Sequence, residues 1–272
     1  MSQIPPIQPS LQDVTTYLID LDGVVYRGES VINGAREFID WLDAQHKKYL
    51  YLTNNSFASE LQVVEKLARV GISTDLSHVM GAAQAAVQSI AQRFPGGSVY
   101  VIGEAPLFDI VRSHGLKISN EDWQGTDVVF VGLDRSFNYK KLTEAVLAIR
   151  KGADFIAINR DPLLPIAGGA LTAGCGTMVA AIEAGSETSP KVIGKPEPAL
   201  LQEAMRKLNS QPSETVMVGD NIGIDIKAGA AAGTQTLLVF SGKDTPASLA
   251  ASTLKPDYVY EDLAAVLHAL KS

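Results

Sequence analysis

Short apolar runs alternate with helical stretches along almost the whole chain. The first run, Tyr17–Asp20, ends in a carboxylate, and a second run, Lys48–Thr53, ends in a cluster of polar residues. Uninterrupted apolar runs of this length are typical of strands that are buried on both faces of a parallel sheet. Between them, Gly34–Gln45 carries apolar residues three and four positions apart, as in an amphipathic helix. The chain therefore begins with a predicted β–α–β unit.

The same alternation continues to the end of the chain. The further strands that we predict are Val79–Met80, Val99–Gly103, Val128–Gly132, Phe155–Asn159, Thr215–Gly219, Thr236–Phe240 and Asp257–Tyr260. The further helices are Ser59–Val70, Ala82–Phe94, Leu107–Ser113, Lys140–Arg150, Thr177–Ala184, Ala199–Leu208, Asp225–Ala232 and Leu263–Lys271. Gly168–Thr177 has the composition of a loop. Strands that alternate with helices predict an α/β fold with a doubly wound parallel sheet.

The pattern also suggests two domains. An alanine-rich helix near residue 82 opens a block with its own β–α alternation, and the first pattern resumes near residue 191. We expect a discontinuous core domain of residues 1–81 and 191–272. A second α/β domain, residues 82–190, is inserted between its halves.

Composition and charge narrow the possible partners. The formal net charge of −7 argues against a nucleic-acid-binding surface, which needs a basic footprint. No apolar run is long enough to span a membrane, and residues 1–13 do not resemble a signal peptide. The single cysteine, Cys175, fits a reducing compartment, so we expect a cytoplasmic protein. The oligomeric state is open, a homodimer included.

Four groups of polar residues lie at the ends of predicted strands or in the loops directly after them. These residues are Asp20 and Asp22; Thr53, Asn54 and Asn55; Lys195; and Asp220, Asn221 and Asp225. If the strands are parallel neighbours, all four groups meet at one edge of the sheet. Clustered carboxylates repel one another unless a cation is present, and hard oxygen ligands in this number favour Mg²⁺. The sequence therefore predicts a Mg²⁺ site.

The remaining residues at these strand ends are of the types that bind a phosphoryl group. A phosphoryl group is bound well by a hydroxyl, by backbone N–H groups at a helix N-terminus and by a lysine. Thr53 and the residues after it, Asn54, Asn55 and Ser56, supply the first two, and Lys195 supplies the third. Asn221 is a further candidate for phosphate binding. The predicted chemistry is phosphoryl transfer to an aspartate.

This combination resembles the phosphatase branch of the haloacid dehalogenase superfamily. Its motifs are matched by Asp20-Leu21-Asp22-Gly23, by Thr53 at a strand end, by Lys195, and by Gly219-Asp220 with Asp225. Three sequence segments are similar to those of the NagD-like, para-nitrophenyl-phosphatase group: Gly-Val-Val-Tyr-Arg-Gly, Thr-Asn-Asn-Ser and Gly-Lys-Pro-Glu-Pro. That group carries a large α/β cap, of the C2 type, between the second and third motifs. The predicted insertion falls in that interval.

The resemblance implies a role for each matched residue. Asp20 is the nucleophile that forms an aspartyl-phosphate, and Asp22 is the general acid and then the general base. Thr53 and the backbone at Asn54 hold the phosphoryl oxygens, and Lys195 neutralises them. Mg²⁺ is held by Asp20, the Asp22 backbone carbonyl and Asp220. Asp225 supports these ligands without binding the ion directly. One departure is Gly223-Ile224 before Asp225, where relatives often carry Thr directly before the last aspartate.

Residues of the inserted domain are candidates for substrate specificity. In NagD-like relatives a Thr-Asn-Pro-Asp segment faces the substrate, and here the corresponding residues are Ile158, Asn159, Arg160 and Asp161. Arg160 either binds a second anionic group on the substrate or is an ordinary surface arginine. Gly169–Thr177 lacks the lysine of a P-loop. Cys175 is expected to be a buried small residue, and the four histidines show no metal-ligand spacing.

The implied function is a Mg²⁺-dependent phosphatase for small phosphorylated metabolites that also hydrolyses para-nitrophenyl phosphate. Nucleoside monophosphates, sugar phosphates, phosphoglycolate and pyridoxal phosphate are the substrates that the resemblance suggests. A phosphotransferase or mutase that uses the same aspartyl-phosphate is an alternative. A phosphate-binding module without catalysis is another, and the Asp20/Asp22 pair argues against it.

Overall fold

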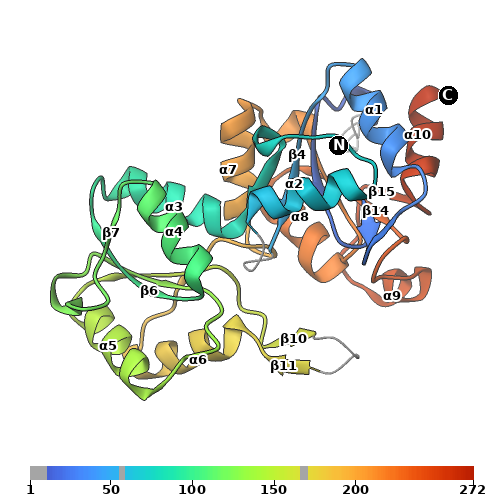
Figure 1. Ribbon diagram of the computed structural model, residues 1–272. Coiled ribbons are helices and arrows are strands. Elements are labelled where there is room, and N and C mark those ends of the chain that lie inside the picture. Colours follow the sequence, from blue (N-terminus) through green and yellow to red (C-terminus); the bar gives the residue numbers. More distant parts are fainter. Residues whose placement is uncertain (1–10, 55–58, 166–170) are drawn as a thin grey trace, which may run out of the picture. The chain divides into compact units, whose positions relative to one another are not determined.

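The computed structural model describes residues 11–54, 59–165 and 171–272 (Figure 1). The chain divides into two compact units. One holds the described residues up to Tyr51 together with Lys66–His78 and Leu201–Ser272; the other holds Leu52–Glu65 and Val79–Leu200. The domain boundaries at residues 81/82 and 190/191 remain a prediction.

The larger sheet has six strands, and most of their residues belong to the first unit. Its order is β15 (Tyr258–Tyr260), β14 (Gln235–Val239), β13 (Thr215–Gly219), β1 (Thr16–Asp20), β4 (Lys48–Thr53) and β5 (Val79–Gly81). β1 pairs with β13, β13 with β14, and β14 with β15, each time in parallel. All residues of β13 and all of β1 except Asp20 are buried, as expected for strands covered on both faces.

The sheet reverses its winding between β1 and β13. From β1 the chain continues through α1 to β4 on one side, and from β13 it continues through α8 to β14 on the other. Open α/β sheets bind ligands at such a switch point, at the carboxyl ends of the strands. Ile19 pairs with Val218 across this point, so the residues that follow them emerge at the same edge.

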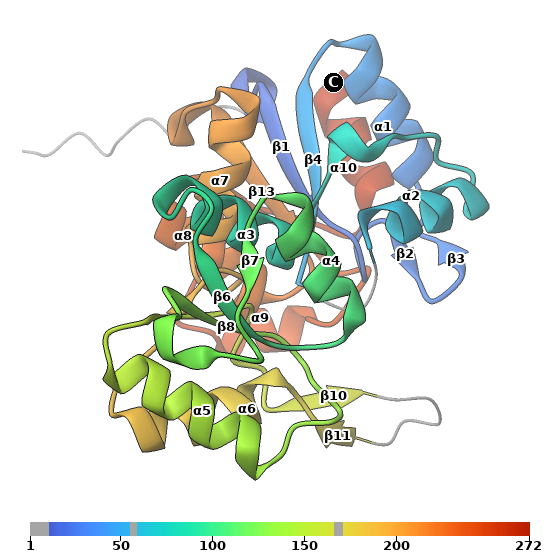
Figure 2. The ribbon, with the colours of Figure 1, turned by 60° about the vertical axis from the view of Figure 1, so that its left-hand side comes forward.

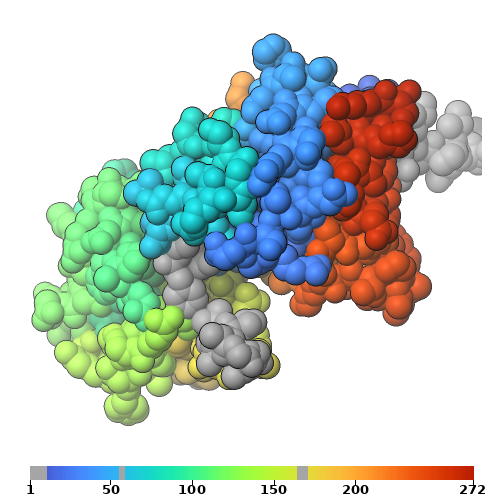
Figure 3. Space-filling view, turned by 45° about the vertical axis from the view of Figure 1, so that its right-hand side comes forward, coloured from blue at the N-terminus to red at the C-terminus, as the bar shows by residue number. Residues whose placement is uncertain are grey.

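Helices cover both faces of this sheet. They are α1 (Ala35–Ala44), α2 (Glu60–Arg69), α7 (Ala199–Leu208), α8 (Lys227–Ala232), α9 (Pro246–Ala251) and α10 (Leu263–Lys271). α1 and α10 lie on one face and α7 and α8 on the other (Figure 2). The surfaces of α1 (blue) and α10 (red) adjoin in Figure 3. Buried residues of α1 recur three and four positions apart, which confirms the predicted amphipathic helix.

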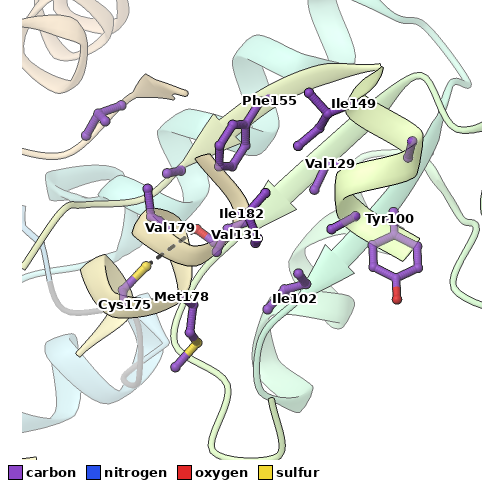
Figure 4. Close-up of a cluster of buried hydrophobic side chains, with 14 of the residues drawn as sticks. Tyr100, Ile102, Val129, Val131, Ile149, Phe155, Cys175, Met178, Val179 and Ile182 are labelled. Carbon is purple, nitrogen blue, oxygen red and sulfur yellow. Dashed lines mark hydrogen bonds between the residues drawn. The ribbon is translucent and has the colours of Figure 1, made fainter. Parts of the chain in front are cut away.

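The second unit has a sheet of its own. Its order is β12 (Lys191–Val192), β9 (Asp154–Ala157), β8 (Val128–Val131), β6 (Ser98–Ile102) and β7 (Lys117–Ile118), and all four pairings are parallel. Its helices are α3 (Ala82–Arg93), α4 (Ala105–Ser113), α5 (Tyr139–Arg150) and α6 (Cys175–Ser186). Side chains of α5 and α6 pack on β6, β8 and β9 in a continuous apolar core (Figure 4).

Two short antiparallel ribbons complete the described structure. β2 (Tyr26–Arg27) pairs with β3 (Ser30–Val31), and β10 (Leu163–Pro165) pairs with β11 (Leu171–Ala173). Single 3₁₀ turns lie at Leu11–Asp13, Leu76–His78, Trp123–Gly125 and Pro212–Glu214.

The α/β fold with parallel sheets is therefore confirmed, and several details differ from the prediction. The segment Gly168–Thr177 is not a loop throughout, because its described part contains β11 and the first turn of α6. The helix expected at Asp225–Ala232 is a π-helical turn, Ile222–Ile226, followed by α8. Lys191–Val192 forms the edge strand β12 of the second sheet. α9 was not predicted, although Thr245 and Pro246 form a recognisable helix start.

Candidate active site

Three carboxylates of the first unit lie together at the switch point of the six-stranded sheet. Asp20 ends β1, Asp220 follows β13, and Asp225 lies in the π-helical turn. One side-chain oxygen of each lies within 4.8 Å of the other two. Asp220 and Asp225 are buried, and Asp20 is partly buried. We call these three residues the carboxylate cluster.

A loop after β14 fixes Asp220. The backbone N–H of Lys243 donates to Asp220 Oδ2 over 2.6 Å, and the N–H of Asp244 donates to the Asp220 carbonyl oxygen over 3.1 Å. The loop approaches so closely that a Cβ atom on Gly242 would lie 1.9 Å from Asp220 Oδ2. Gly23, with φ of 87°, approaches the same carboxylate, because a Cβ atom there would lie 2.2 Å from Asp220 Oδ2. Only glycine fits at these two positions.

The π-helical turn brings Asp225 back to the end of β13. The Asn221 carbonyl accepts N–H groups from Ile224, Asp225 and Ile226, which tightens the turn around it. Asp225 Oδ2 in return accepts the Asn221 N–H over 3.1 Å. The Asn221 side chain caps this turn by accepting the Gly223 N–H. π-Helical turns are rare and often occur at functional sites.

The donor set of the cluster fits a divalent cation. Three carboxylates this close, two of them buried, would repel one another strongly, and a hard cation relieves that repulsion. Oxygen ligands alone favour a hard divalent cation such as Mg²⁺, Ca²⁺ or Mn²⁺. Within the described residues this is the one group of three or more acidic, histidine or cysteine side chains with such spacing.

Asp22 lies two residues after Asp20 in the sequence and has a different environment from the cluster. Its side chain is 65% exposed, and its Oδ1 lies 3.8 Å from Lys66 Nζ. The same ammonium lies 3.7 Å from the centroid of the Tyr26 ring. Burial, and then the charges of Asp22 and Asp20, raise the pKa of the Tyr26 hydroxyl, so the ring is a neutral phenol. Lys66 was not predicted as a site residue.

In the second unit, the Asn54 side chain holds the backbone of Lys195. Asn54 Nδ2 donates to the Lys195 carbonyl oxygen over 2.7 Å, and the Lys195 N–H donates to Asn54 Oδ1 over 2.9 Å. We call this pair of hydrogen bonds the Asn54–Lys195 clamp. Lys195 is 2% exposed, and Thr53, at the end of β4, is also buried. Asn55 and Ser56 lie outside the described residues.

The predicted specificity residues of the second unit follow β9. Asn159 is buried, and its Oδ1 accepts the Asp161 N–H over 3.1 Å. Arg160 forms a two-pronged ion pair with Glu183 of α6, with N–O distances of 2.7 and 3.0 Å. The guanidinium, followed by the Ser189 hydroxyl, lowers the pKa of Glu183 to about 2. Arg160 is thus an ion-paired arginine at the surface, and its role in substrate specificity stays a prediction.

The expectation for Cys175 is confirmed. Its side chain is buried at the start of α6, and burial raises the pKa of the thiol to about 12. A thiol with this pKa is not a nucleophile at neutral pH.

Two features of the site escaped the sequence analysis. The segment Ser241-Gly242-Lys243 follows β14 and so marks one more polar strand end, which the apolar run before it could have revealed. Lys66 lies on the polar side of α2, and helical periodicity alone does not show which loop such a side chain reaches.

Comparisons with known proteins identify the family. Residues 17–117 match the family model of haloacid dehalogenase-like hydrolases, and residues 192–266 match a second, HAD-hydrolase-like model. An acid sugar phosphatase of Staphylococcus epidermidis is 37% identical, over 91% of this chain and 94% of the relative. One of Staphylococcus saprophyticus is 34% identical, over 96% and 100%.

Solved structures agree with these matches. The p-nitrophenyl phosphatase of Archaeoglobus fulgidus is 31% identical with a TM-score of 0.88, and the match covers 95% of this chain and 100% of that one. NagD of Escherichia coli is 30% identical with a TM-score of 0.83, over 92% and 97%. The chain belongs to the haloacid dehalogenase-like hydrolases, as a NagD-like phosphatase, which makes it a phosphoric monoester hydrolase.

The described part of the chain contains no helix with the length and apolar character that crossing a bilayer requires.

Proposed function

We propose that this protein is a Mg²⁺-dependent phosphatase that hydrolyses small sugar phosphates through an aspartyl-phosphate on Asp20. The observation that carries the proposal is the carboxylate cluster, which unites Asp20 with Asp220 and Asp225 at the switch point of the sheet. In this proposal residues 1–81 and 191–272 form the catalytic core, and residues 82–190 form the cap.

The first step transfers the phosphoryl group. An Asp20 carboxylate oxygen attacks phosphorus, and the bond between phosphorus and the ester oxygen breaks with its electron pair on that oxygen. Asp22 donates a proton to the departing oxygen, which leaves as an alcohol. Thr53, the backbone near Asn54, Asn55 and Lys195 bind the phosphoryl oxygens, with Asn221 as a further candidate. Lys195 is well suited to this, because its backbone is held by the Asn54–Lys195 clamp.

The second step releases phosphate. Asp22, now a carboxylate, takes a proton from water as the water oxygen attacks phosphorus. The bond between phosphorus and Asp20 breaks, which restores the Asp20 carboxylate and yields inorganic phosphate. Asp20, the Asp22 backbone carbonyl and Asp220 would hold Mg²⁺, with Asp225 in support, and the bound cation would offset the negative charge of the phosphate.

The names of the relatives favour a sugar phosphate among the candidate substrates. Proteins 34% and 37% identical over almost the whole chain are named acid sugar phosphatases. Asn159, Arg160 and Asp161 are proposed to contribute to specificity. An Arg160→Ala variant with unchanged kcat/KM on the best substrate would remove Arg160 from that role. We propose a cytoplasmic location and no macromolecular substrate, in line with the negative net charge.

A direct assay tests the proposal. Hydrolysis of para-nitrophenyl phosphate and of a panel of sugar phosphates should require Mg²⁺ and be lost in Asp20→Asn. An Asp225→Asn variant should weaken the response to Mg²⁺ and retain some turnover. Transfer to an added sugar phosphate that outruns transfer to water would instead indicate a phosphotransferase. Phosphoprotein that accumulates without turnover would indicate a binding module.

A further inference from the structure

Among the ion pairs of the described residues, Asp22 has one cationic partner, Lys66, which reaches it from another element. Asp22 lies in the loop after β1, whereas Lys66 lies near the end of α2. The Lys66 Nζ atom lies 3.8 Å from Asp22 Oδ1 and 3.7 Å from the centroid of the Tyr26 ring. Both contacts belong to the first unit.

The Tyr26 ring is a rigid platform for this ammonium. Tyr26 is 3% exposed, and its backbone closes the loop through hydrogen bonds from the Gly23 N–H to the Tyr26 carbonyl and from the Tyr26 N–H to the Leu21 carbonyl. A lysine over the face of an aromatic ring is held by the ring quadrupole, the more so when it is partly desolvated. The Lys66 side chain is 23% exposed. Its ammonium therefore has a defined position.

The Asp22 side chain itself has little other support. It is 65% exposed, and within the described part of the chain it forms no second ion pair. An exposed aspartate samples several rotamers, whereas a general acid must lie within hydrogen-bond reach of the oxygen that it protonates. A fixed cation 3.8 Å away favours rotamers that point the carboxylate toward it.

We propose that Lys66 is a positioning residue, which holds the Asp22 carboxylate in the orientation used for proton transfer, with the Tyr26 ring as its support. This inference rests on the proposed function. It adds a residue that does not contact the reacting atoms and acts through Asp22.

Proton donation matters more for a poor leaving group than for a good one. An alkyl phosphate, such as a sugar phosphate, expels a strongly basic oxygen that must be protonated as it leaves. Para-nitrophenolate leaves without such help. A misplaced Asp22 therefore slows phosphoryl transfer from alkyl phosphates and spares transfer from para-nitrophenyl phosphate, while it slows the water step for both.

The test compares Lys66→Met with Lys66→Arg on the full-length protein with Mg²⁺. For Lys66→Met we expect kcat/KM to fall roughly ten- to a hundredfold on an alkyl phosphate, a fraction of what a general acid contributes. On para-nitrophenyl phosphate kcat/KM should change less than about threefold, with kcat lowered and a burst of nitrophenolate. Lys66→Arg should restore most of the loss, because it returns the cation over the ring.

Arg69→Met is the matched control. Arg69 lies on the same helix, one turn further on, and pairs with the exposed Glu29 at 3.6 Å. The Arg69→Met variant should keep the wild-type kcat/KM on both substrates. The positioning role would be overturned if Lys66→Met lowered kcat/KM equally on both substrates. It would also be overturned if Lys66→Arg did not restore kcat/KM on the alkyl phosphate although its Tm is unchanged. Failure of the proposed function would be recognised separately, because Asp20→Asn would then still hydrolyse the substrates.

Discussion

The Asn54 side chain and the Lys195 backbone exchange two hydrogen bonds, from Asn54 Nδ2 to the Lys195 carbonyl and from the Lys195 N–H to Asn54 Oδ1. An amide side chain that pairs with a peptide group in this way acts like a neighbouring strand. The segment beside it is tight as well, because a Cβ on Gly194 would lie 2.7 Å from Asn54 Oδ1. The buried Lys195 thus begins from a fixed backbone.

Removal of this clamp should reduce activity. For Asn54→Ala we expect kcat/KM on para-nitrophenyl phosphate to fall about tenfold or more, because a displacement of about 1 Å can cost a hundredfold. The lost hydrogen bonds should also destabilise the fold by about 1–3 kcal/mol. Steady-state kinetics and urea unfolding measure the two effects.

Asn120 provides a control with the same geometry. Its side chain also exchanges two hydrogen bonds with one backbone residue, Val101, at 3.0 and 2.8 Å. Asn120→Ala should lose similar stability and keep the wild-type kcat/KM. If both variants lose activity in proportion to stability, the clamp has no specific role at Lys195.

Metal binding should stabilise the protein through the carboxylate cluster. A divalent cation that binds only the folded state adds about 2.7 kcal/mol at a hundred times its Kd by mass action. Relief of the repulsion among the three carboxylates favours its binding. We expect Mg²⁺ to raise the Tm of wild type and chelation to reverse this. Asp220→Asn should abolish the shift and raise the Tm of the metal-free protein. An equal Mg²⁺ shift in Asp220→Asn would place the cation elsewhere.

Gly242 should be essential for the position of Asp220. In Gly242→Ala the new Cβ would lie 1.9 Å from Asp220 Oδ2, so the loop or the carboxylate must move. We expect activity to fall by at least about tenfold, together with loss of the Mg²⁺-dependent Tm shift. Gly125→Ala is the comparison, since a Cβ there meets nothing within 4 Å. Full activity in Gly242→Ala would show that the close approach is not required.

The Arg160–Glu183 pair should contribute a pH-dependent stability. The folded-state pKa of Glu183 is about 2, below its ordinary value of 4.5, so the contribution is complete above pH 4.5 and is lost as the pH falls through 2. Because the pair is partly exposed, we expect at most about 1 kcal/mol at neutral pH. Urea midpoints of wild type and Glu183→Gln should therefore converge between pH 5 and the acid limit. A gap that is constant with pH would show that the ionised pair contributes nothing.

Much of this architecture could be read from the sequence, because buried parallel strands leave uninterrupted apolar runs. Tyr17–Asp20 and Thr215–Gly219 both lie in strands of the six-stranded sheet, and the carboxylates at their ends, Asp20 and Asp220, do meet. The order of strands and the register of Ile19 against Val218 were not readable, because they depend on packing between segments about two hundred residues apart in sequence.

The short elements were harder to predict for a local reason. β2, β3 and β12 have two residues each, which is too few for any periodicity. The π-helical turn at Ile222–Ile226 has no sequence signature of its own, and it depends on the contact between Asp225 and the end of β13. Lys66 was missed because its partner, Asp22, is more than forty residues away in sequence.

The central claim is that Asp20 carries the phosphoryl group between the two steps, and mass spectrometry of quenched enzyme tests it most directly. The enzyme is mixed with para-nitrophenyl phosphate and Mg²⁺, quenched in acid during turnover, and digested. The account predicts one added phosphoryl group on the peptide that contains Asp20, and none in Asp20→Asn. Borohydride should reduce the aspartyl-phosphate with release of phosphate, which leaves homoserine at position 20. A phosphoryl group on another residue, or turnover in Asp20→Asn, would contradict it.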